Sequence, residues 1–146
     1  MISVDTNILF PALESSNPDH AKASGFLRSL RERDEVVVSE FVLLELYGLL
    51  RNPAVLARPL PAEKAASICE SFRRHPRWQV IGFPPDSRSF HDHFWPWLRH
   101  DSFARRRAFD WRMALSLVRQ GVTEFATVNE KDFQDFGFER VWNPLR

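Results

Sequence analysis

Short apolar runs alternate with amphipathic stretches along this chain. Runs rich in β-branched residues predict strands, and apolar residues repeated every three or four positions predict helices. The predicted strands span residues 2–5, 36–38, 78–83, 124–127 and 140–142. The predicted helices span residues 6–14, 21–30, 40–51, 59–74 and 107–120. Strands that alternate with helices indicate the α/β class, with a mostly parallel sheet of four to five strands covered on both faces.

Capping and breaking residues mark the ends of these predicted elements. Ser39 can cap helix 40–51, which Asn52-Pro53 then ends, and Gly121 ends helix 107–120. Residues 86–104 are rich in aromatic side chains but have no clear period, and residues 129–133 predict a turn. There is no internal repeat and no low-complexity linker, so we expect a single domain over residues 1–146.

Composition and charge narrow the functional classes. The net charge is only +1 and 44% of residues are hydrophobic, as in an ordinary soluble globule without a global polybasic field. Cys69 is the single cysteine, which rules out an internal disulfide and favours a reducing compartment. No apolar stretch approaches the roughly 20 residues that span a bilayer. A cytoplasmic location without a membrane partner is therefore expected.

Most of the positive charge is carried by arginine. Lysine occurs only at positions 22, 64 and 131. The guanidinium group presents a planar fork of donors that suits phosphate, which is consistent with a nucleic-acid partner. Genome base composition is an equally simple explanation of the same bias.

Three acidic residues stand where the pattern predicts apolar side chains. Asp5 directly follows the first predicted strand, at the edge where open α/β sheets bind ligands. Asp110 falls on the inward face of helix 107–120, and Glu45 lies in the middle of a helix so apolar that we expect it to be buried. A buried carboxylate must be paired, protonated or bound to a metal. A salt bridge for Glu45 and a favourable helix-start position for Asp110 are the alternatives to a shared site.

If these carboxylates meet, they favour a divalent cation. Two carboxylates about 5 Å apart repel by about 3 kcal/mol at an effective dielectric near 20. Hard oxygen ligands, without a cysteine cluster or a strong histidine spacing, favour Mg²⁺ or Mn²⁺ over Zn²⁺. His91-Asp92-His93 is a second, weaker candidate for a metal pair.

The order of these motifs resembles the PIN-domain ribonucleases, and more narrowly the VapC-type toxins of bacterial toxin–antitoxin pairs. The resemblance covers the whole chain. Its motifs are Val4-Asp5-Thr6-Asn7, Leu44-Glu45-Leu46, Phe109-Asp110-Trp111, the segment 121–133 and the ending Arg140-Val141-Trp142-Asn143-Pro144. It implies a three-layer α/β/α PIN-like domain.

The resemblance also implies the site and its chemistry. Asp5, Glu45 and Asp110 map to the family's metal-holding acids, and Asn129 stands at the position of a fourth acid. Asp132, three residues later, is either a partial substitute or a turn-capping residue. Asn7 and Thr127 would orient water or phosphate, or else form local hydrogen bonds at strand ends. The implied reaction is Mg²⁺-assisted hydrolysis of RNA phosphodiesters to a 5′-phosphate and a 3′-hydroxyl, by a homodimer held inactive by a cognate antitoxin protein.

The basic segment Arg105, Arg106 and Arg107 is a further candidate for RNA binding. The alternative is a solvated helix start, but arginines at a helix start oppose the helix dipole, which favours a role in binding. Neighbouring aromatic residues, among them Trp95, Trp97 and Phe103, could stack on bases or pack in the core.

Two other functional classes are kept as alternatives. The first is a PIN-fold binding module without catalysis, which Asn129 keeps open. The second is an Asp-based phosphoryl-transfer protein, although the acidic pair or the acid at position 7 that such proteins need is absent.

Overall fold

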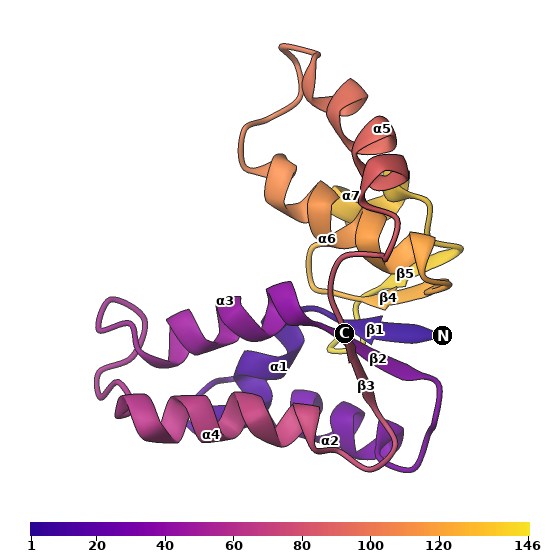
Figure 1. Ribbon diagram of the computed structural model, residues 1–146. Coiled ribbons are helices and arrows are strands. Elements are labelled where there is room, and N and C mark those ends of the chain that lie inside the picture. Colours follow the sequence, from indigo (N-terminus) through magenta and orange to yellow (C-terminus); the bar gives the residue numbers. More distant parts are fainter.

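Five parallel strands form the central sheet of the computed structural model, which describes residues 1–146 (Figure 1). The strand order is β3-β2-β1-β4-β5, and every neighbouring pair is parallel. The strands are β1 (Ile2–Val4), β2 (Val36–Ser39), β3 (Gln79–Ile81), β4 (Glu124–Ala126) and β5 (Arg140–Trp142). The predicted α/β class, strand positions and parallel sheet are confirmed.

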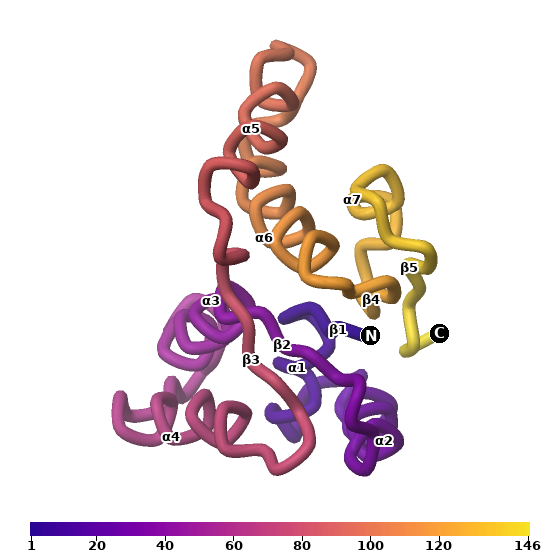
Figure 2. The backbone as a smooth tube through the Cα atoms, turned by 45° about the vertical axis from the view of Figure 1, so that its right-hand side comes forward, coloured from indigo at the N-terminus to yellow at the C-terminus, as the bar shows by residue number.

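Helices cover both faces of the sheet and complete three layers (Figures 1 and 2). One face carries α1 (Thr6–Leu13), α2 (His20–Leu30), α3 (Glu40–Leu50) and α4 (Ala62–Arg73). The other face carries α5 (Ser87–Leu98), α6 (Arg107–Arg119) and α7 (Glu130–Phe133), which is followed by a short 3₁₀ turn, η1 (Gln134–Phe136). None of these helices is both long and apolar enough to cross a bilayer.

The chain reverses its direction across the sheet at β1. From β1 it moves outward through β2 to β3, and then crosses to β4 and β5 on the other side. Such a reversal opens a crevice at the carboxyl ends of the two strands that flank it. Here those strands are β1 and β4, and the backbone N–H of Asp5 still donates to the carbonyl of Ala126, at 2.9 Å. Asp5 and the residues after Ala126 therefore lie at this crevice.

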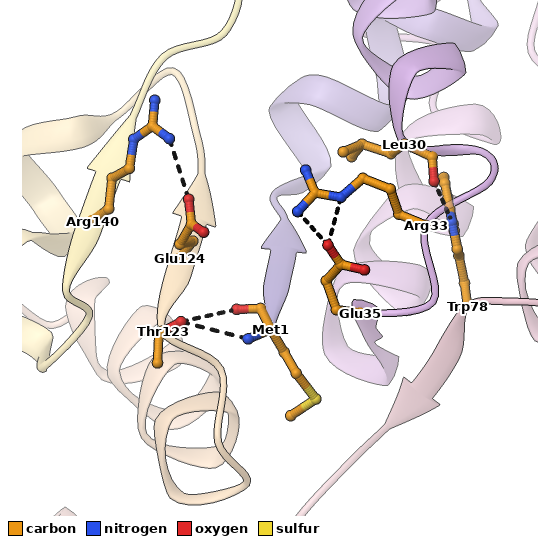
Figure 3. A network of polar contacts seen from close by, with 8 residues as sticks. All are labelled: Met1, Leu30, Arg33, Glu35, Trp78, Thr123, Glu124 and Arg140. Atoms are coloured by element: carbon orange, nitrogen blue, oxygen red, sulfur yellow. Dashed lines mark hydrogen bonds and ion pairs between the residues drawn. The ribbon is translucent and has the colours of Figure 1, made fainter.

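The opposite edge, at the amino ends of the strands, is closed by local polar contacts (Figure 3). The Trp78 indole N–H donates to the carbonyl of Leu30 at 3.1 Å, and Arg33 pairs with Glu35 just before β2. Arg140 pairs with Glu124 across the first residues of β5 and β4, at 3.2 Å. The charged side chains Arg33, Glu35, Glu124 and Arg140 at this edge are thus engaged in ion pairs.

Two segments differ from the sequence-based expectation. Residues 86–104, which have no clear period, contain α5, whose start is capped by the Asp86 carboxylate accepting from the Ser89 N–H at 3.0 Å. Pro96 lies inside this helix, and a proline in a helix interior removes a backbone hydrogen bond, so the local sequence argues against a helix there. The turn predicted at residues 129–133 is the short helix α7, because the stretch is too short to show a helical period and Phe133 anchors it in the core.

Candidate active site

Asp5 caps the amino end of α1 directly after β1. One carboxylate oxygen accepts from the backbone N–H of Thr6 at 2.7 Å, and the other accepts from the Thr127 hydroxyl at 2.6 Å. The residue is only 8% exposed. The pKa of Asp5 is raised to about 6, mainly by burial and also by the negative charges of Glu45 and Asp110, while the two hydrogen bonds oppose the rise. Asp5 is therefore a buried acid with two ordered donors and two acidic neighbours.

Thr127 and Asn7 hold Asp5 in place. Thr127 directly follows β4 and is fully buried. Its hydroxyl donates to Asp5 and accepts from the Asn7 side-chain amide at 3.1 Å. The amide oxygen of Asn7 accepts from the backbone N–H of Val128 at 3.1 Å. This network ties the ends of β1 and β4 together, so both residues predicted to orient water or phosphate are engaged with Asp5 and its surroundings.

Asp110 lies in the first turn of α6 and is partly buried. Its pKa is raised to about 6, mainly by burial and also by the negative charges of Asp132 and Glu45, whereas the positive charge of Arg107 opposes the rise. Asp132, on α7, is exposed. The charge of Asp132 affects the pKa of Asp110 more than the charge of Glu45 does, so Asp132 belongs with the acids around Asp110.

The expectation that Glu45 is buried is wrong. The buried side of α3 is formed by Val42, Leu43, Leu46 and Leu50, while Leu44 is 72% exposed and Glu45 is also exposed. Helix α3 packs against α1, α4 and β2, and the rest of its surface stays open although most of its residues are apolar. Glu45 therefore faces the site from this open surface without the cost of full burial.

A cavity of about 420 Å³ between α3 and α6 contains both Glu45 and Asp110. Its other lining residues are Phe41, Val42, Leu44, Phe109, Arg112 and Met113. Two acids from helices far apart in sequence thus share one open space, and each contributes negative charge at Asp5.

The acidic side chains of the site have no cationic partner. None of the salt bridges in the structure involves Asp5, Glu45, Asp110 or Asp132. No three such side chains are close enough to form a ready ligand set for a metal ion. Mg²⁺ keeps several of its waters and is held by one or two carboxylates, so it fits acids that are neighbours without being in contact. The all-oxygen donor set suits that ion.

The remaining predicted residues lie around this centre. Asn129 is exposed just before α7, and its backbone N–H donates to the Thr127 hydroxyl at 3.1 Å. Arg105 and Arg106 are exposed at the start of α6. Arg107 is turned back onto the protein, where it donates to the carbonyl of Asp132 at 3.0 Å and stacks on Phe136.

His91 and His93 do not form the alternative metal pair. The ring of His91 accepts from the Trp95 indole N–H at 3.1 Å, and Nδ1 of His93 lies 2.8 Å from the carbonyl of Ser89. Both rings are thus engaged with the neighbouring turn of their own helix.

Arg112 is a site residue that the sequence analysis did not single out. It lines the cavity beside Glu45 and Asp110. Its helical spacing could have indicated this position from the sequence, because residues 109, 112 and 113 fall on one face of α6 beside Asp110.

Comparisons with known proteins agree with this architecture. A family model described as PIN domain matches residues 2–89. Ribonuclease VapC24 of Mycobacterium tuberculosis is 46% identical over 145 residues, which are 99% of this chain and 97% of that protein. That alignment extends over Asp110, Asn129 and Asp132, which lie beyond the part matched by the family model.

Solved structures with the same fold include two VapC proteins. The crystal structure of Mycobacterium tuberculosis VapC20, a sarcin-ricin loop cleaving toxin, matches with a TM-score of 0.63 at 18% identity, over 86% of this chain and 87% of that chain. VapBC-1 from nontypeable Haemophilus influenzae matches with a TM-score of 0.63 at 17% identity, over 100% of both chains. These likenesses establish the fold, and the family model and the full-length sequence relative establish the family. The chain belongs to the PIN-domain family and, within it, to the VapC ribonucleases.

Proposed function

We propose that this protein is a Mg²⁺- or Mn²⁺-dependent endoribonuclease and the toxin of a toxin–antitoxin pair. The observation that carries the proposal is the group of unpaired acids Asp5, Glu45, Asp110 and Asp132 at the carboxyl edge of the sheet. Membership of the VapC ribonucleases supports the same reaction. It also argues against an Asp-based phosphoryl-transfer protein, because the chain lacks the acidic pair or the acid at position 7 that such proteins need.

Asp5, Glu45 and Asp110 would hold the ion, with Asp132 and Asn129 at the rim. When bound, the ion supplies an activated water at neutral pH and offsets charge on the phosphoryl oxygens. Thr127 and Asn7 keep the Asp5 carboxylate in one orientation through the 2.6 Å and 3.1 Å hydrogen bonds. The open cavity between α3 and α6 leaves room for the substrate beside Glu45 and Asp110.

The relatives of this chain support a proposal for its partners and assembly. The structural neighbours include VapBC complexes from Haemophilus influenzae and Rickettsia felis, and the latter is bound to a fragment of promoter DNA. We propose that a cognate antitoxin protein likewise binds this chain. A homodimer of single PIN domains over residues 1–146, acting on RNA in the cytoplasm, completes the proposal.

The decisive experiment is cleavage of a mixed RNA pool by the purified protein. We expect cleavage with Mg²⁺, none with EDTA, and restored cleavage when Mn²⁺ is added, with 5′-phosphate and 3′-hydroxyl products. Asp5→Asn and Asp110→Asn should each lower the rate by about 10³-fold or more, because the charge that holds the ion is removed. Asp101→Asn, at an exposed loop acid, is the matched control. Cleavage that survives EDTA or either site variant would contradict the mechanism.

A non-catalytic binding module is the second candidate, because an amide, Asn129, stands at the position of the fourth acid. Mg²⁺ titration by calorimetry separates the two candidates. The nuclease should bind Mg²⁺ in a manner that Asp5→Asn abolishes, and a module without a metal site should show no such heat.

A further inference from the structure

The guanidinium of Arg112 lies over two aromatic rings. Its Cζ atom lies 4.2 Å from the ring centre of Phe41 on α3 and 5.5 Å from that of Phe109 on α6. Its Nε is buried without a hydrogen-bond partner, and its guanidinium takes part in no salt bridge. An arginine has five N–H donors in a rigid fork, so this is a preoriented cation whose donors are not used for the fold.

Arg107 also has a buried Nε without a hydrogen-bond partner, but its terminal N–H group is used for the fold. Arg107 also stacks on two rings, those of Phe103 and Phe136. In addition, its terminal N–H group donates to the carbonyl of Asp132 at 3.0 Å. That contact ties α6 to α7. Arg112 forms no such contact, although it lies on the same helix and also lies over two aromatic rings.

The position of Arg112 is the junction of two cavities. The first is the acidic cavity between α3 and α6 that contains Glu45 and Asp110. The second, of about 290 Å³, is lined mostly by aromatic residues, and it shares Phe109 and Arg112 with the first. Several rings around it are open to solvent, with Phe109 65%, Trp95 54% and Phe83 48% exposed. The Arg112 guanidinium therefore lies between carboxylates that suit a metal ion and aromatic rings that suit planar groups.

We propose that Arg112 binds the backbone phosphate of an RNA nucleotide next to the cleaved bond, while the exposed ring of Phe109 stacks on its base. The inference rests on the proposed function, since it assigns a substrate subsite beside the acids. Planar guanidinium donors match the two free oxygens of a phosphodiester, and aromatic faces stack on unpaired bases. A carboxylate of an acidic peptide could also pair with the Arg112 guanidinium. It has no planar ring, however, that could stack on the exposed aromatic side chains.

The test measures RNA binding by the Asp5→Asn variant, which should not cleave the RNA. A labelled single-stranded RNA of mixed sequence is titrated by fluorescence anisotropy with Mg²⁺ present. Adding Arg112→Gln should weaken binding by about 10- to 100-fold, as expected for loss of hydrogen bonds from a charged donor. Over roughly 50 to 200 mM salt, the slope of log affinity against log salt should fall by about 0.7, the value for one phosphate contact on a single strand.

Matched variants separate a binding role from a structural one. Arg58→Gln removes the same charge from an exposed loop and should leave affinity and slope unchanged. Arg112→Lys should keep most of the salt slope, because it keeps the charge, but should recover only part of the affinity. Phe109→Ala should weaken binding without changing the slope. Thermal melting by circular dichroism verifies that each variant is folded.

The outcomes distinguish this inference from the proposed function. If the wild-type chain cleaves RNA and Arg112→Gln changes neither affinity nor slope, the inference is overturned and the nuclease stands. If the wild type does not cleave but RNA binding shows the Arg112-dependent slope, the subsite stands and the nuclease fails. Competition by poly-glutamate that equals competition by RNA would assign Arg112 to carboxylates and would also overturn the inference.

Discussion

The chemistry of the site is decided at the level of single side chains around Asp5. Burial and the charges of Glu45 and Asp110 raise its pKa, while the donors of Thr127 and Thr6 oppose the rise. The outcome is a carboxyl group with a pKa of about 6, poised to change its charge near neutral pH. A neighbouring cation would then favour the ionised form.

Thr127→Val tests the contribution of the hydroxyl group. The change removes the 2.6 Å hydrogen bond to Asp5 and the acceptor for Asn7, so the pKa of Asp5 should rise further above its usual value. We expect weaker Mg²⁺ binding and a cleavage rate reduced by about 10- to 100-fold at neutral pH, with a partial recovery at higher pH. Thr123→Val is the control, because the Thr123 hydroxyl contacts Met1 at the opposite edge of the sheet. Equal loss in both variants would contradict the role assigned to Thr127.

The raised pKa values of Asp5 and Asp110 predict how metal-free stability depends on pH. Each pKa rises from 3.8 to about 6, so the folded state favours the neutral carboxyl. The stability from this source is complete below the usual pKa and is lost as the pH rises through about 6. Mg²⁺ should offset the loss, so it should raise Tm more at about pH 7.5 than at about pH 5.

The measurement is a pair of melting curves, with Mg²⁺ and with EDTA, at each pH. The double variant Asp5→Asn and Asp110→Asn should show no Mg²⁺-dependent shift at either pH. A shift of the same size at both pH values in the wild type would show that these two carboxyls do not hold the ion.

At the scale of elements, the placement of α6 decides the geometry of the site. This helix carries Asp110 and Arg112, and its buried side is anchored by Trp111. The Trp111 indole N–H donates to the carbonyl of Phe94 on α5 at 3.2 Å, and its ring packs 4.9 Å from both Trp97 and Phe136. The aromatic residues of segment 86–104 thus serve mainly to dock α5 on α6.

Trp111→Phe should therefore loosen α6. The ring packing is largely kept, but the carbonyl of Phe94 loses its partner, which should cost about 1–2 kcal/mol of the free energy of unfolding. Trp95→Phe is the control, since the Trp95 indole donates to His91 on the exposed side of α5 and its loss should be nearly neutral. Urea denaturation followed by circular dichroism gives both values. Equal stability of the two variants would contradict the docking role.

At the scale of the whole molecule, the two edges of the sheet have opposite character. The amino edge is closed by paired groups such as Arg140–Glu124, and the carboxyl edge gathers unpaired acids. One hydrophobic core of 29 buried residues joins the helices of both faces through the sheet. The acidic side chains of the site are therefore carried by elements that share one continuous hydrophobic core.

A continuous core predicts a single cooperative unfolding transition. Trp78 is buried beside the α2 and α4 layer, and Trp111 is buried in the layer on the other face. Tryptophan fluorescence and far-UV circular dichroism should give the same midpoint in urea within error. Two transitions, or probes that disagree, would contradict the proposal of one domain over residues 1–146.

Local information in the sequence was enough for the order and class of the elements, for the position of Asp5 directly after β1 and for that of Asp110 at the start of α6, whereas Thr127 was indicated only by the family resemblance. Apolar runs, helical periods and caps act within a few residues, and a strand end marks the edge of a parallel sheet. The exposure of Glu45, the α7 helix and the stacking of Arg112 between Phe41 and Phe109 were decided only by tertiary packing. Each depends on which face of a helix is covered by a segment distant in sequence, and that is set by the assembled layers rather than by neighbours along the chain.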